Sequence, residues 1–506
     1  MSKLSMLLGG VLCIDPAANV IEYQRRWCTW GELGASIEAI KSYLEKLGLG
    51  YGARLGVFVR NRPDSVAAIL ASIREDACMV SLNPLLPDTR LFADLRNLKL
   101  PVVIGESAEF ERQGVLEVIR EVGGAIIELH SVLKGARLKP GFDAIVGADI
   151  KREEPEVIIE MLTSGTTGSP KRIPLKRHAF ENSFVSALSY ERSRRADDAP
   201  KLRSGTQLAT NPMTHIGGLW GVLATILGGR KICLIEKFSV EAWRDAVVRH
   251  RPKVANVVPA GLRMLLDAKI PKEDMSSLVA LRTGAAPLPP TVVKEFWERY
   301  QLPVLQNYGA TEFSGAVAGW TLHNFKAFHD SKAGSVGRFQ PNVIGRVVDA
   351  ESGKELNAGT EGVLEMKAKQ FGNGDQWLRT TDRAVIDADG FLFIRGRTDN
   401  VIIRGGFKVH PDDVAAVMEE HPAVREAVVV GMKDERLGAV PVAAIMLKAG
   451  TTQPPAEELT AFARQRLLPY QVPMRFLFVD DVPRTASMKP ALLQVRALFE
   501  PEKLHG

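Results

Sequence analysis

The residues with the clearest chemical potential lie at 162–171, read as LTSGTTGSPK, after an apolar, strand-like run at 156–161. The glycines let backbone N–H groups approach phosphate oxygens closely. The hydroxyl side chains are further hydrogen-bond donors, and Lys171 adds a compact positive charge. The spacing gives no Gly-Lys-Ser/Thr ending, so this is not a Walker loop. The stretch predicts an anion-binding loop, with an ordinary Ser/Gly-rich loop as the alternative.

The length and composition are typical of a globular protein with several domains. The chain has 506 residues, of which 45% are hydrophobic and 25% are charged. A net charge of +6 arises from 65 basic and 59 acidic residues, without a long basic block. This balance does not indicate nucleic acid binding, and it suits anionic small molecules.

The cysteines and the N-terminal segment indicate the cellular compartment in which the protein is expected. Cys13, Cys28, Cys78 and Cys233 are scattered without CxxC spacing, which favours a reducing compartment over a zinc site or a disulfide framework. The start, MSKLSMLLGGVLCI, resembles a signal peptide but lacks a small-residue cleavage site. No apolar run reaches the roughly 18–20 residues of a membrane span. We therefore expect a soluble cytoplasmic protein.

Strand-like and helical stretches alternate along most of the chain. A capping-box pattern at Thr29 and Glu32 begins a helix that ends near Gly48. Further strands are expected at 54–60, 78–82, 101–105, 172–175, 231–236, 254–258, 280–283 and 304–306. Further helices are expected at 64–75, 88–98, 178–190, 222–227, 240–250 and 291–300. Alternation at these lengths is typical of parallel βαβ units.

Three of the expected strands end in loops of small residues. These loops are the opening stretch, GAAP at 284–287 and NYGATE at 307–312. The loops at the carboxyl ends of parallel strands line the ligand crevice of such a sheet. The three loops therefore predict where a ligand binds.

The pattern changes twice towards the C-terminus. From about residue 334 the strands are short and separated by turns, which predicts a small antiparallel or barrel-like subdomain over 334–396. After residue 400 strands and helices mix again. We expect an α/β protein with a large N-terminal domain (1–396), a hinge (397–400) and a small α+β C-terminal lid domain (401–506).

Seven motifs occur in a fixed order: LTSGTTGSPK, PMTHIGGL, GAAP, NYGATE, WLRTTD, GRTDNVIIRGGFKVHP and PRTASMKP. This order resembles the adenylate-forming superfamily of acyl-CoA synthetases, aryl-CoA ligases, peptide-synthetase adenylation domains and beetle luciferases. The resemblance spans about residues 20–498. It implies that Mg-ATP activates a carboxylate to an acyl-adenylate with release of pyrophosphate. The acyl group then passes to a thiol, usually that of coenzyme A.

The resemblance implies roles for residues around the nucleotide, where anions must be neutralised and oriented. Lys489, Thr311 and Glu312 would be catalytic, with Lys489 bridging the carboxylate and the phosphates. Glu312 and Thr167 would bind Mg²⁺. The residues implied to bind ATP or AMP are Thr163, Ser164, Gly165, Thr166, Thr167, Gly168, Lys171, Gly284, Ala285, Ala286, Asn307, Tyr308, Gly309, Asp382 and Arg397. Among these, Tyr308 would lie against adenine and Asp382 would bind the ribose, assisted by Arg397.

The acid pocket implied by the resemblance is mostly apolar. Its residues are Met213, His215, Trp220, Gly284, Asn307, Phe313 and Gly315. His215 would gate the acyl pocket and the pantetheine tunnel, with a purely structural histidine as the alternative. Asn307 either hydrogen-bonds a polar substituent or fixes its loop. Residues 210–220 contain no acidic residue to bind a substrate amine, which argues against an amino-acid-activating adenylation domain. We expect an aryl or medium-length acyl acid rather than a long fatty acid.

The second step uses the C-terminal domain, which rotates in this superfamily about a position that matches Asp399. The rotation would bring Gly405, Gly406, Phe407 and Lys408 to coenzyme A. Two alternatives stay open: a stand-alone enzyme that loads a carrier protein, and an inactive nucleotide-binding homologue. We expect a monomer or a homodimer.

Three departures from the superfamily pattern bear on the site. Met488 and Thr381 each stand where relatives usually have glycine, and the connection from Met366 to Trp377 is short. If residue 488 needs a positive φ, methionine is strained there.

The hinge generates a testable expectation. Asp399→Pro locks φ at one hinge bond, so thioester formation should fall more than adenylation. The two half-reactions are measured separately, as pyrophosphate exchange into ATP and as thioester formation from added acyl-adenylate. An equal loss of both would contradict a hinge at this position.

Overall fold

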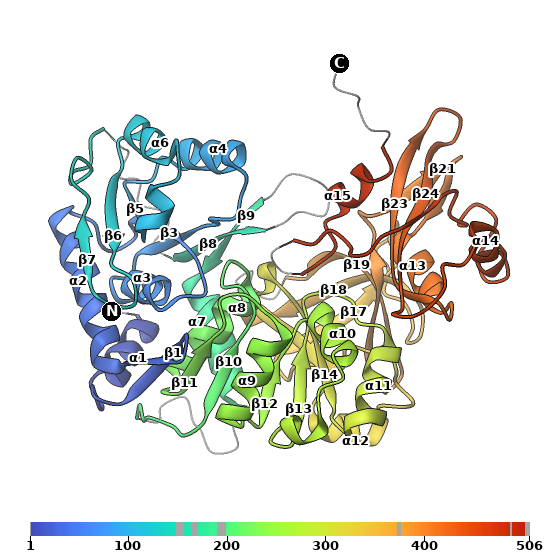
Figure 1. Ribbon diagram of the computed structural model, residues 1–506, viewed down its shortest axis with the longest axis horizontal. Coiled ribbons are helices and arrows are strands. Elements are labelled where there is room, and N and C mark those ends of the chain that lie inside the picture. Colours follow the sequence, from blue (N-terminus) through green and yellow to red (C-terminus); the bar gives the residue numbers. More distant parts are fainter. Residues whose placement is uncertain are drawn as a thin grey trace.

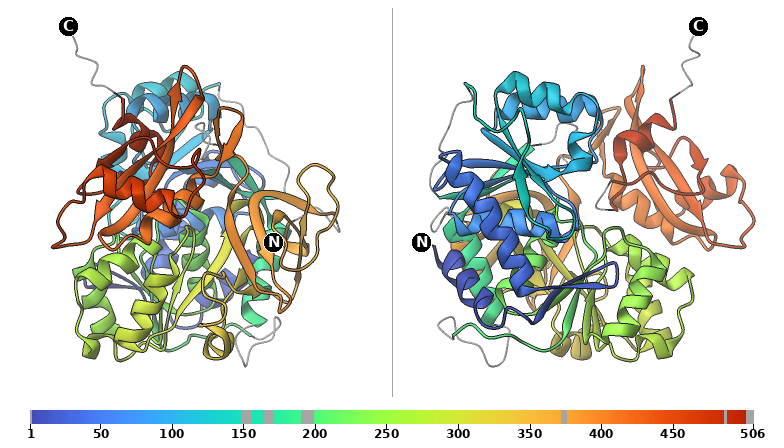
Figure 2. Two further views of the ribbon diagram at one scale, coloured as in Figure 1. Left: turned by 90° about the vertical axis from the view of Figure 1, so that its right-hand side faces the viewer. Right: turned by 60° about the vertical axis from the view of Figure 1, so that its left-hand side comes forward.

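The computed structural model describes residues 2–147, 156–163, 171–189, 199–371, 376–485 and 488–500. The chain forms a large body and a smaller C-terminal body, drawn in orange and red at the upper right of Figure 1. The right-hand view in Figure 2 also shows the C-terminal body as a separate unit. The predicted α/β class with a large and a small domain is confirmed.

A seven-stranded sheet forms the N-terminal part of the large body. Its order is β7-β6-β5-β3-β4-β8-β9, and only the two edge strands, β7 and β9, run antiparallel to their neighbours. The strands are β3 (Arg54–Phe58), β4 (Cys78–Leu82), β5 (Val102–Glu106), β6 (Ala125–Leu129), β7 (Ala136–Leu138), β8 (Val157–Thr163) and β9 (Lys171–Lys176). Strands β4, β5 and β6 are buried along their whole length, as expected for a parallel sheet that is covered on both faces.

Helices cover the two faces of this sheet. One apolar core lies under α1, α2 and α3, and a second lies under α4 and α6. The helices are α1 (Lys3–Leu12), α2 (Trp30–Lys46), α3 (Pro63–Arg74), α4 (Asp88–Leu98), α5 (Ser107–Phe110) and α6 (Val115–Val122). The predicted capping box is present at the start of α2, where Thr29 and Glu32 satisfy each other's backbone N–H groups.

The first residues of the chain form helix α1, whereas the sequence analysis described them only as a short apolar run. Leu4, Leu8 and Val11 follow a 4-3 spacing, and each is at most 1% exposed in the core beside α2 and α3. Ser2 caps the helix by accepting a hydrogen bond from the backbone N–H of Ser5. The run is therefore the buried face of an amphipathic helix. None of the described helices has the length and hydropathy required to cross a membrane.

Two further sheets complete the parallel part of the large body. Their orders are β10-β11-β1-β2 and β12-β13-β14-β15-β16. Their strands are β1 (Asn19–Tyr23), β2 (Arg26–Thr29), β10 (Thr206–Ala209), β11 (Lys231–Leu234), β12 (Val254–Asn256), β13 (Ala280–Thr283), β14 (Val304–Ala310), β15 (Gly315–Gly319) and β16 (Arg338–Phe339). The helices around them are α7 (Arg177–Ser189), α8 (Ile216–Leu227), α9 (Val240–His250), α10 (Pro259–Asp267), η1 (Lys272–Met275), α11 (Pro290–Tyr300), η2 (Thr311–Phe313) and α12 (Leu322–Phe328).

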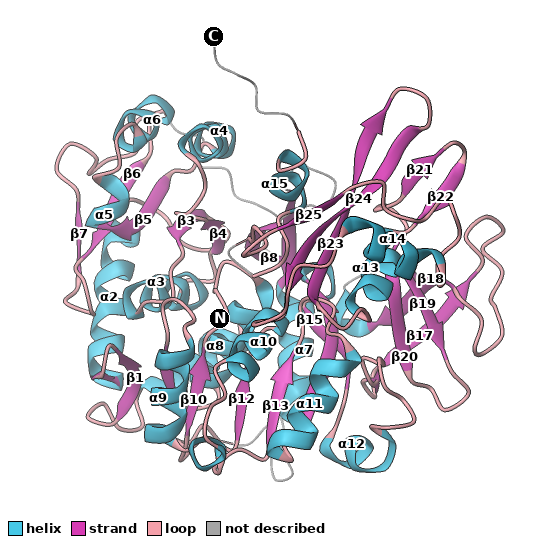
Figure 3. Cartoon of the chain, turned by 45° about the vertical axis from the view of Figure 1, so that its right-hand side comes forward, coloured by secondary structure: helices cyan, strands magenta, loops and turns pink. Residues whose placement is uncertain are grey.

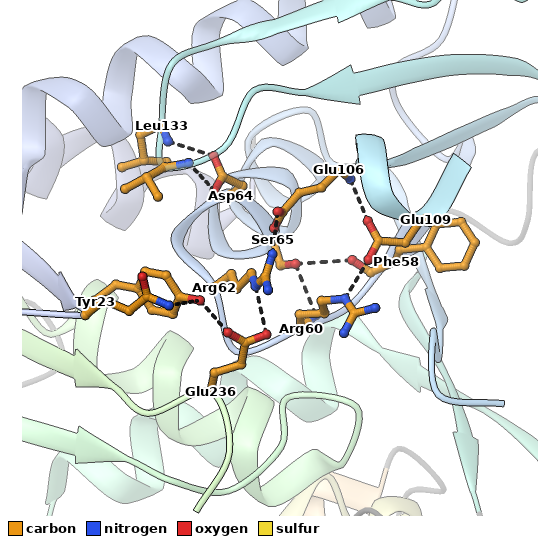
Figure 4. A network of polar contacts seen from close by, with 12 residues as sticks. Tyr23, Phe58, Arg60, Arg62, Asp64, Ser65, Glu106, Glu109, Leu133 and Glu236 are labelled. Carbon is orange, nitrogen blue, oxygen red and sulfur yellow. Dashed lines mark hydrogen bonds and ion pairs between the residues drawn. The ribbon is translucent and has the colours of Figure 1, made fainter. Parts of the chain in front are cut away.

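A polar network ties the first two sheets together where β3, β5 and β11 end (Figure 4). Arg62 bonds to Glu106 at 2.8 Å and to Glu236 at 2.8 Å, and Tyr23 of β1 donates to Glu236. Arg60 pairs with Glu109 at 2.5 Å. Each carboxylate faces an arginine or a hydroxyl donor, so this charged junction can stay buried between the sheets.

The remaining strands form an antiparallel sheet and the C-terminal body. The antiparallel sheet runs β17-β18-β19-β20, and the C-terminal sheet runs β22-β21-β24-β23 with β25 beside β24. The strands are β17 (Val343–Val348), β18 (Gly362–Ala368), β19 (Leu378–Ile386), β20 (Leu392–Arg397), β21 (Ile402–Arg404), β22 (Phe407–Val409), β23 (Val424–Asp434), β24 (Gly438–Leu447) and β25 (Phe476–Phe478). The helices are η3 (Lys369–Phe371), α13 (Pro411–Glu419), α14 (Ala456–Arg464) and α15 (Leu492–Ala497).

Candidate active site

Two of the three predicted loops meet at the ends of neighbouring parallel strands. β13 and β14 pair in parallel with Thr283 beside Gln306, so the next residues, Gly284 and Asn307, lie side by side. Gly284 follows β13, whereas Asn307 is still part of β14, which continues to Ala310 instead of ending at residue 306 as predicted. A Cβ atom at residue 284 would lie 2.2 Å from Oδ1 of Asn307 and 3.0 Å from its carbonyl oxygen. Only glycine leaves room for the Asn307 side chain at this point. This close packing supports the loop-fixing interpretation of Asn307.

Tyr308 and Asp382 connect this loop with the antiparallel sheet. The Tyr308 hydroxyl donates a hydrogen bond to Oδ2 of Asp382 in β19. Burial raises the pKa of Tyr308, and the neighbouring Asp382 raises it further. Burial also raises the pKa of Asp382, whereas the hydrogen bond from Tyr308 and the charge of Arg397 lower it. Tyr308 is therefore protonated and donates to the Asp382 carboxylate, whose negative charge Arg397 stabilises.

Arg397 connects the same carboxylate with the segment that leads to the C-terminal body. It is the register partner of Asp382 across β19 and β20. Its guanidinium forms two parallel hydrogen bonds to Asp399, each of 2.7 Å. Thr398 donates to the Thr381 carbonyl from its backbone N–H at 2.7 Å and from its hydroxyl at 3.0 Å. Arg397 and Thr398, the two residues before Asp399, thus hold the predicted hinge segment to the large body.

Lys489 reaches this group of residues from the C-terminal body. Burial lowers the pKa of Lys489 and Arg397 lowers it further, whereas Asp382 and Glu312 raise it. The ammonium group is therefore within electrostatic range of Arg397, Asp382 and Glu312. The structure therefore brings together four residues that the sequence places in three separate motifs.

The turn that carries Lys489 has the backbone expected of a glycine. Met488 has φ +61°, the left-handed region that L-residues other than glycine rarely adopt. The turn is closed by hydrogen bonds from the Met488 N–H to the Thr485 carbonyl (2.9 Å) and from the Thr485 N–H to the Lys489 carbonyl (2.8 Å). The strain at Met488 is real, but it does not keep Lys489 from the cleft.

Glu312 has the properties of a metal ligand. It lies in η2 with an exposed side chain, and within the described ranges it makes no hydrogen bond or ion pair. Its charge raises the pKa of Tyr308, Asp382 and Lys489. An accessible carboxylate oxygen suits Mg²⁺, which prefers hard oxygen ligands and keeps several waters.

His215 caps the apolar side of the site. It is the residue before α8, and its Nε2 atom is buried without a hydrogen-bond partner among the described residues. Burial lowers the pKa of His215 to about 4, and the charge of Lys489 acts in the same direction. The imidazole is therefore neutral at pH 7. This electrostatic effect also places His215 close to Lys489.

Among the predicted acid-pocket residues, two are buried and two others lie close together. Met213 and Phe313 are 1% and 4% exposed. A Cβ atom at Gly315 would lie 3.1 Å from Oγ of Ser183 and 3.9 Å from the Trp220 ring. Ser183 was not among the predicted residues, because nothing in the sequence of α7 distinguishes it from other helix positions.

Asn61 is a second positioning residue that the sequence analysis did not single out. Its Oδ1 accepts from the Met213 N–H at 2.9 Å. Its Nδ2 donates to the carbonyls of Asn211 (3.0 Å) and Ile235 (3.2 Å). One buried amide thus fixes the segment that leads to His215. An asparagine just after a predicted strand, in the run Asn61-Arg62-Pro63, was the only available signal.

The short connection between β18 and β19 closes on the pocket. Gln370 in η3 is 3% exposed and donates to the Phe313 carbonyl at 3.0 Å. The Phe371 ring packs on Phe313 with centroids 5.6 Å apart. The connection therefore forms the wall behind Phe313.

The predicted phosphate-binding loop is described only at its two ends. Ser164, Gly165, Thr166, Thr167 and Gly168 fall outside the described residues, although Thr163 and Lys171, which flank them, pair across β8 and β9.

The predicted CoA-binding residues are exposed in this arrangement. Gly405 and Gly406 form a left-handed two-residue turn between β21 and β22. Phe407 is 57% exposed and stacks on Tyr470. In Figures 1 and 3 this hairpin lies on the outer side of the C-terminal body, whereas α15 lies on the side that faces the large body.

Comparisons with known proteins agree with this geometry. A family profile described as AMP-binding enzyme matches residues 15–374, and one described as AMP-binding enzyme C-terminal domain matches residues 413–489. The 2-succinylbenzoate–CoA ligase of Bacillus cereus is 28% identical over 96% of this chain and 97% of its own length. The indoleacetate–CoA ligase of Aromatoleum aromaticum is 28% identical over 96% of each chain. The o-succinylbenzoate CoA synthetase of Bacillus subtilis, solved with its acyl-adenylate intermediate, shares the fold with a TM-score of 0.77 at 24% identity over 97% of each chain.

The contact between Gly284 and Asn307 can be tested by substitution. Gly284→Ala forces the Asn307 side chain away, which should displace Tyr308 and weaken ATP binding by at least about tenfold, within the roughly 1–3 kcal/mol of an overpacked site. Titration calorimetry with ATP measures the effect. Gly50→Ala, where a Cβ atom meets nothing within 4 Å, is the matched control. Adding Asn307→Ala to Gly284→Ala should recover part of the loss, and unchanged affinity in the single variant would contradict the steric role.

Proposed function

The chain belongs to the AMP-binding enzyme family, and from this premise we propose that it is an ATP-dependent carboxylic acid–CoA ligase. It forms an acyl-adenylate with release of pyrophosphate, and then an acyl-CoA thioester with release of AMP. The observation that carries the proposal is the position of Lys489. A lysine from the C-terminal body interacts electrostatically with Asp382, Glu312 and Arg397 of the large body, and this interaction supports a role in the attack on a nucleotide phosphate.

The first half-reaction is a problem of charge, because an anionic carboxylate must attack the α-phosphate of an anionic nucleotide. Lys489 bridges the substrate carboxylate and the phosphates and orients the attack. Thr311 lies beside the α-phosphate, and residues 163–171 with Lys171 hold the outer phosphates. Burial disfavours the charge of Lys489 in the free enzyme, so the incoming anions restore a favourable environment for the ammonium group.

The nucleotide is held on the opposite side by the loops after β13 and β14. Tyr308 packs on the adenine, whose other face meets Gly284, Ala285 and Ala286. Asp382 accepts hydrogen bonds from the ribose hydroxyls, with Arg397 beside it. Glu312 and Thr167 would hold Mg²⁺, which neutralises phosphate charge when bound.

The acid occupies the apolar pocket beside His215, and we propose an aryl acid. Trp220, Phe313 and Met213 offer an apolar, partly aromatic lining that suits a flat ring. The two curated relatives act on aryl acids according to their names, and they align with nearly the whole chain. His215 is neutral at pH 7, so it can gate the pocket without repelling Lys489.

The second half-reaction requires the other face of the C-terminal domain. We propose that residues 397–400 are the hinge, with Asp399 at the pivot. Rotation replaces Lys489 by the Gly405–Gly406 turn, Phe407 and Lys408, which then contact coenzyme A. Since ATP and coenzyme A are cytoplasmic metabolites, the cytoplasm is the expected site of the reaction, and a monomer or a homodimer is the expected assembly.

Two measurements test this function. Exchange of labelled pyrophosphate into ATP should depend on an added acid, with indoleacetate, 2-succinylbenzoate and benzoate as the first aryl acids and octanoate and palmitate for comparison. Adding coenzyme A should then give a thioester and AMP. A chain that binds ATP but shows no acid-dependent exchange would be an inactive homologue, and exchange without CoA thioester would indicate a different acceptor.

The proposed role of Lys489 predicts a selective defect. Lys489→Ala should lower the exchange rate by at least about a thousandfold, in line with the loss of a main electrostatic contact to the transition state. ATP affinity should change by less than about tenfold, because the loops of the large body still bind the nucleotide. Lys433→Ala, a lysine in β23 of the same body, is the control. Exchange at the wild-type rate in Lys489→Ala would contradict the role.

A further inference from the structure

A cluster of six charged side chains lies where the two bodies meet, outside the nucleotide site. Its members alternate in sign, with three arginines and three carboxylates that come from α10, the end of α13, the start of β23 and the segment before Lys489. They are Arg263, Asp267, Glu419, Arg425, Glu426 and Arg484. Since positive and negative charges are equal in number, the cluster is neutral as a whole.

Within this cluster, Arg263 in α10 makes most of the contacts that join the two bodies. Its Nη2 atom bonds to both carboxylate oxygens of Glu419, at 3.1 and 3.3 Å, and its Nη1 atom donates to the Arg425 carbonyl at 2.5 Å. Asp267, one turn further along α10, pairs with the Arg425 side chain. The side chains of Arg263 and Glu419 are only 12% and 17% exposed. These contacts therefore form in a largely desolvated place, where the Coulomb attraction within an ion pair is stronger than at a free surface and the loss of one partner leaves the other charge buried and unpaired.

The same arginine is linked to the turn that carries Lys489. Oε2 of Glu426 lies 3.8 Å from Nη1 of Arg263 and 2.6 Å from Nη2 of Arg484. Nη1 of Arg484 donates to the carbonyl of Met488 at 3.3 Å. A chain of three side chains thus runs from α10 of the large body to the residue before Lys489. It ends on a residue with φ +61°, which needs outside support to keep its backbone in place.

We propose that Arg263 is a positioning residue for the adenylation step. It docks the C-terminal domain in the orientation that presents Lys489, and through Glu426 and Arg484 it supports the turn that aims this lysine. Arg484 and Glu426 belong to the same body and stay paired when that body rotates. Arg263 belongs to the other body, so its contacts exist only in the adenylation orientation. The inference rests on the proposed function, and it adds a set of contacts that favours adenylation over thioester formation.

The energetic consequence is a shift of an equilibrium between two orientations. A residue that binds only one orientation stabilises it by its differential free energy, and its loss moves the population towards the other. Arg263→Ala should therefore lower the rate of acid-dependent pyrophosphate exchange by about tenfold, the change that corresponds to roughly 1.4 kcal/mol. Thioester formation from added acyl-adenylate and coenzyme A should be unchanged or faster, because it uses the other orientation.

The kinetic test compares these two half-reactions in matched variants. The acid is whichever of indoleacetate, 2-succinylbenzoate and benzoate gives the fastest exchange in the unmodified chain. Arg244→Ala removes an arginine that pairs with Asp274 at 2.5 Å inside the large body, so it controls for the loss of an ion pair that does not join the two bodies. Arg263→Lys keeps the charge and should recover part of the exchange rate. An equal loss of both half-reactions in Arg263→Ala, or no loss in either, would overturn the proposal.

A distance measurement tests docking without any acid. Spin labels are attached after Glu298→Cys in α11 and Glu457→Cys in α14, two exposed positions on different bodies, with the exposed Cys13 replaced by Cys13→Ser. The distribution of the reference chain should have one main distance, and Arg263→Ala should add a second population, whereas Arg244→Ala should not. Identical distributions in the reference chain and Arg263→Ala would overturn the docking role. Failure of the unmodified chain to catalyse exchange would instead overturn the proposed function, and the distance data would still decide whether Arg263 docks the domain.

Discussion

The site depends on keeping one lysine charge available in a place that is largely removed from water. Burial works against the charged form of Lys489, and Arg397 adds to that cost, while Asp382 and Glu312 offset it. A lysine in this balance is a poor permanent partner for any single carboxylate. It is correspondingly ready for a ligand that carries several negative charges. The same balance explains why the surrounding polar groups are held by other contacts, such as the hydrogen bond between Tyr308 and Asp382.

The arrangement of Arg397 shows how this site is linked to movement. Its two parallel hydrogen bonds to Asp399 occupy the guanidinium of a residue that pairs in register with Asp382. Thr398 is held to Thr381 by two hydrogen bonds to one carbonyl oxygen. The residues that would turn are therefore bonded to the residues that would bind ribose. A movement of the hinge residues would therefore act directly on the residues that would bind ribose, without a long chain of contacts between them.

Local patterns were enough to predict most of the elements. The strand before Gly284 ends in the structure where it was predicted to end, whereas the strand predicted to end before Asn307 continues to Ala310, because it also pairs with β15. Helix α1 was not predicted, because an apolar run of that length at the chain start is ambiguous until its partners are known. Asn61 and Ser183 were not predicted either. Their importance comes from neighbours more than a hundred residues away, which no local pattern records.

The order and chemistry of the motifs, and with them the types of residue that can handle phosphates and a carboxylate, were determined by the sequence alone. Even the unusual backbone at Met488 could be anticipated from the residue type that it replaces. Which face of the C-terminal body meets the cleft was decided only by the tertiary structure. That choice depends on ion pairs such as Arg263 with Glu419, whose partners are separated by 156 positions in the chain. The sequence does not show that charged residues on two helix surfaces will pair, because each residue is equally well solvated by water until folding buries it.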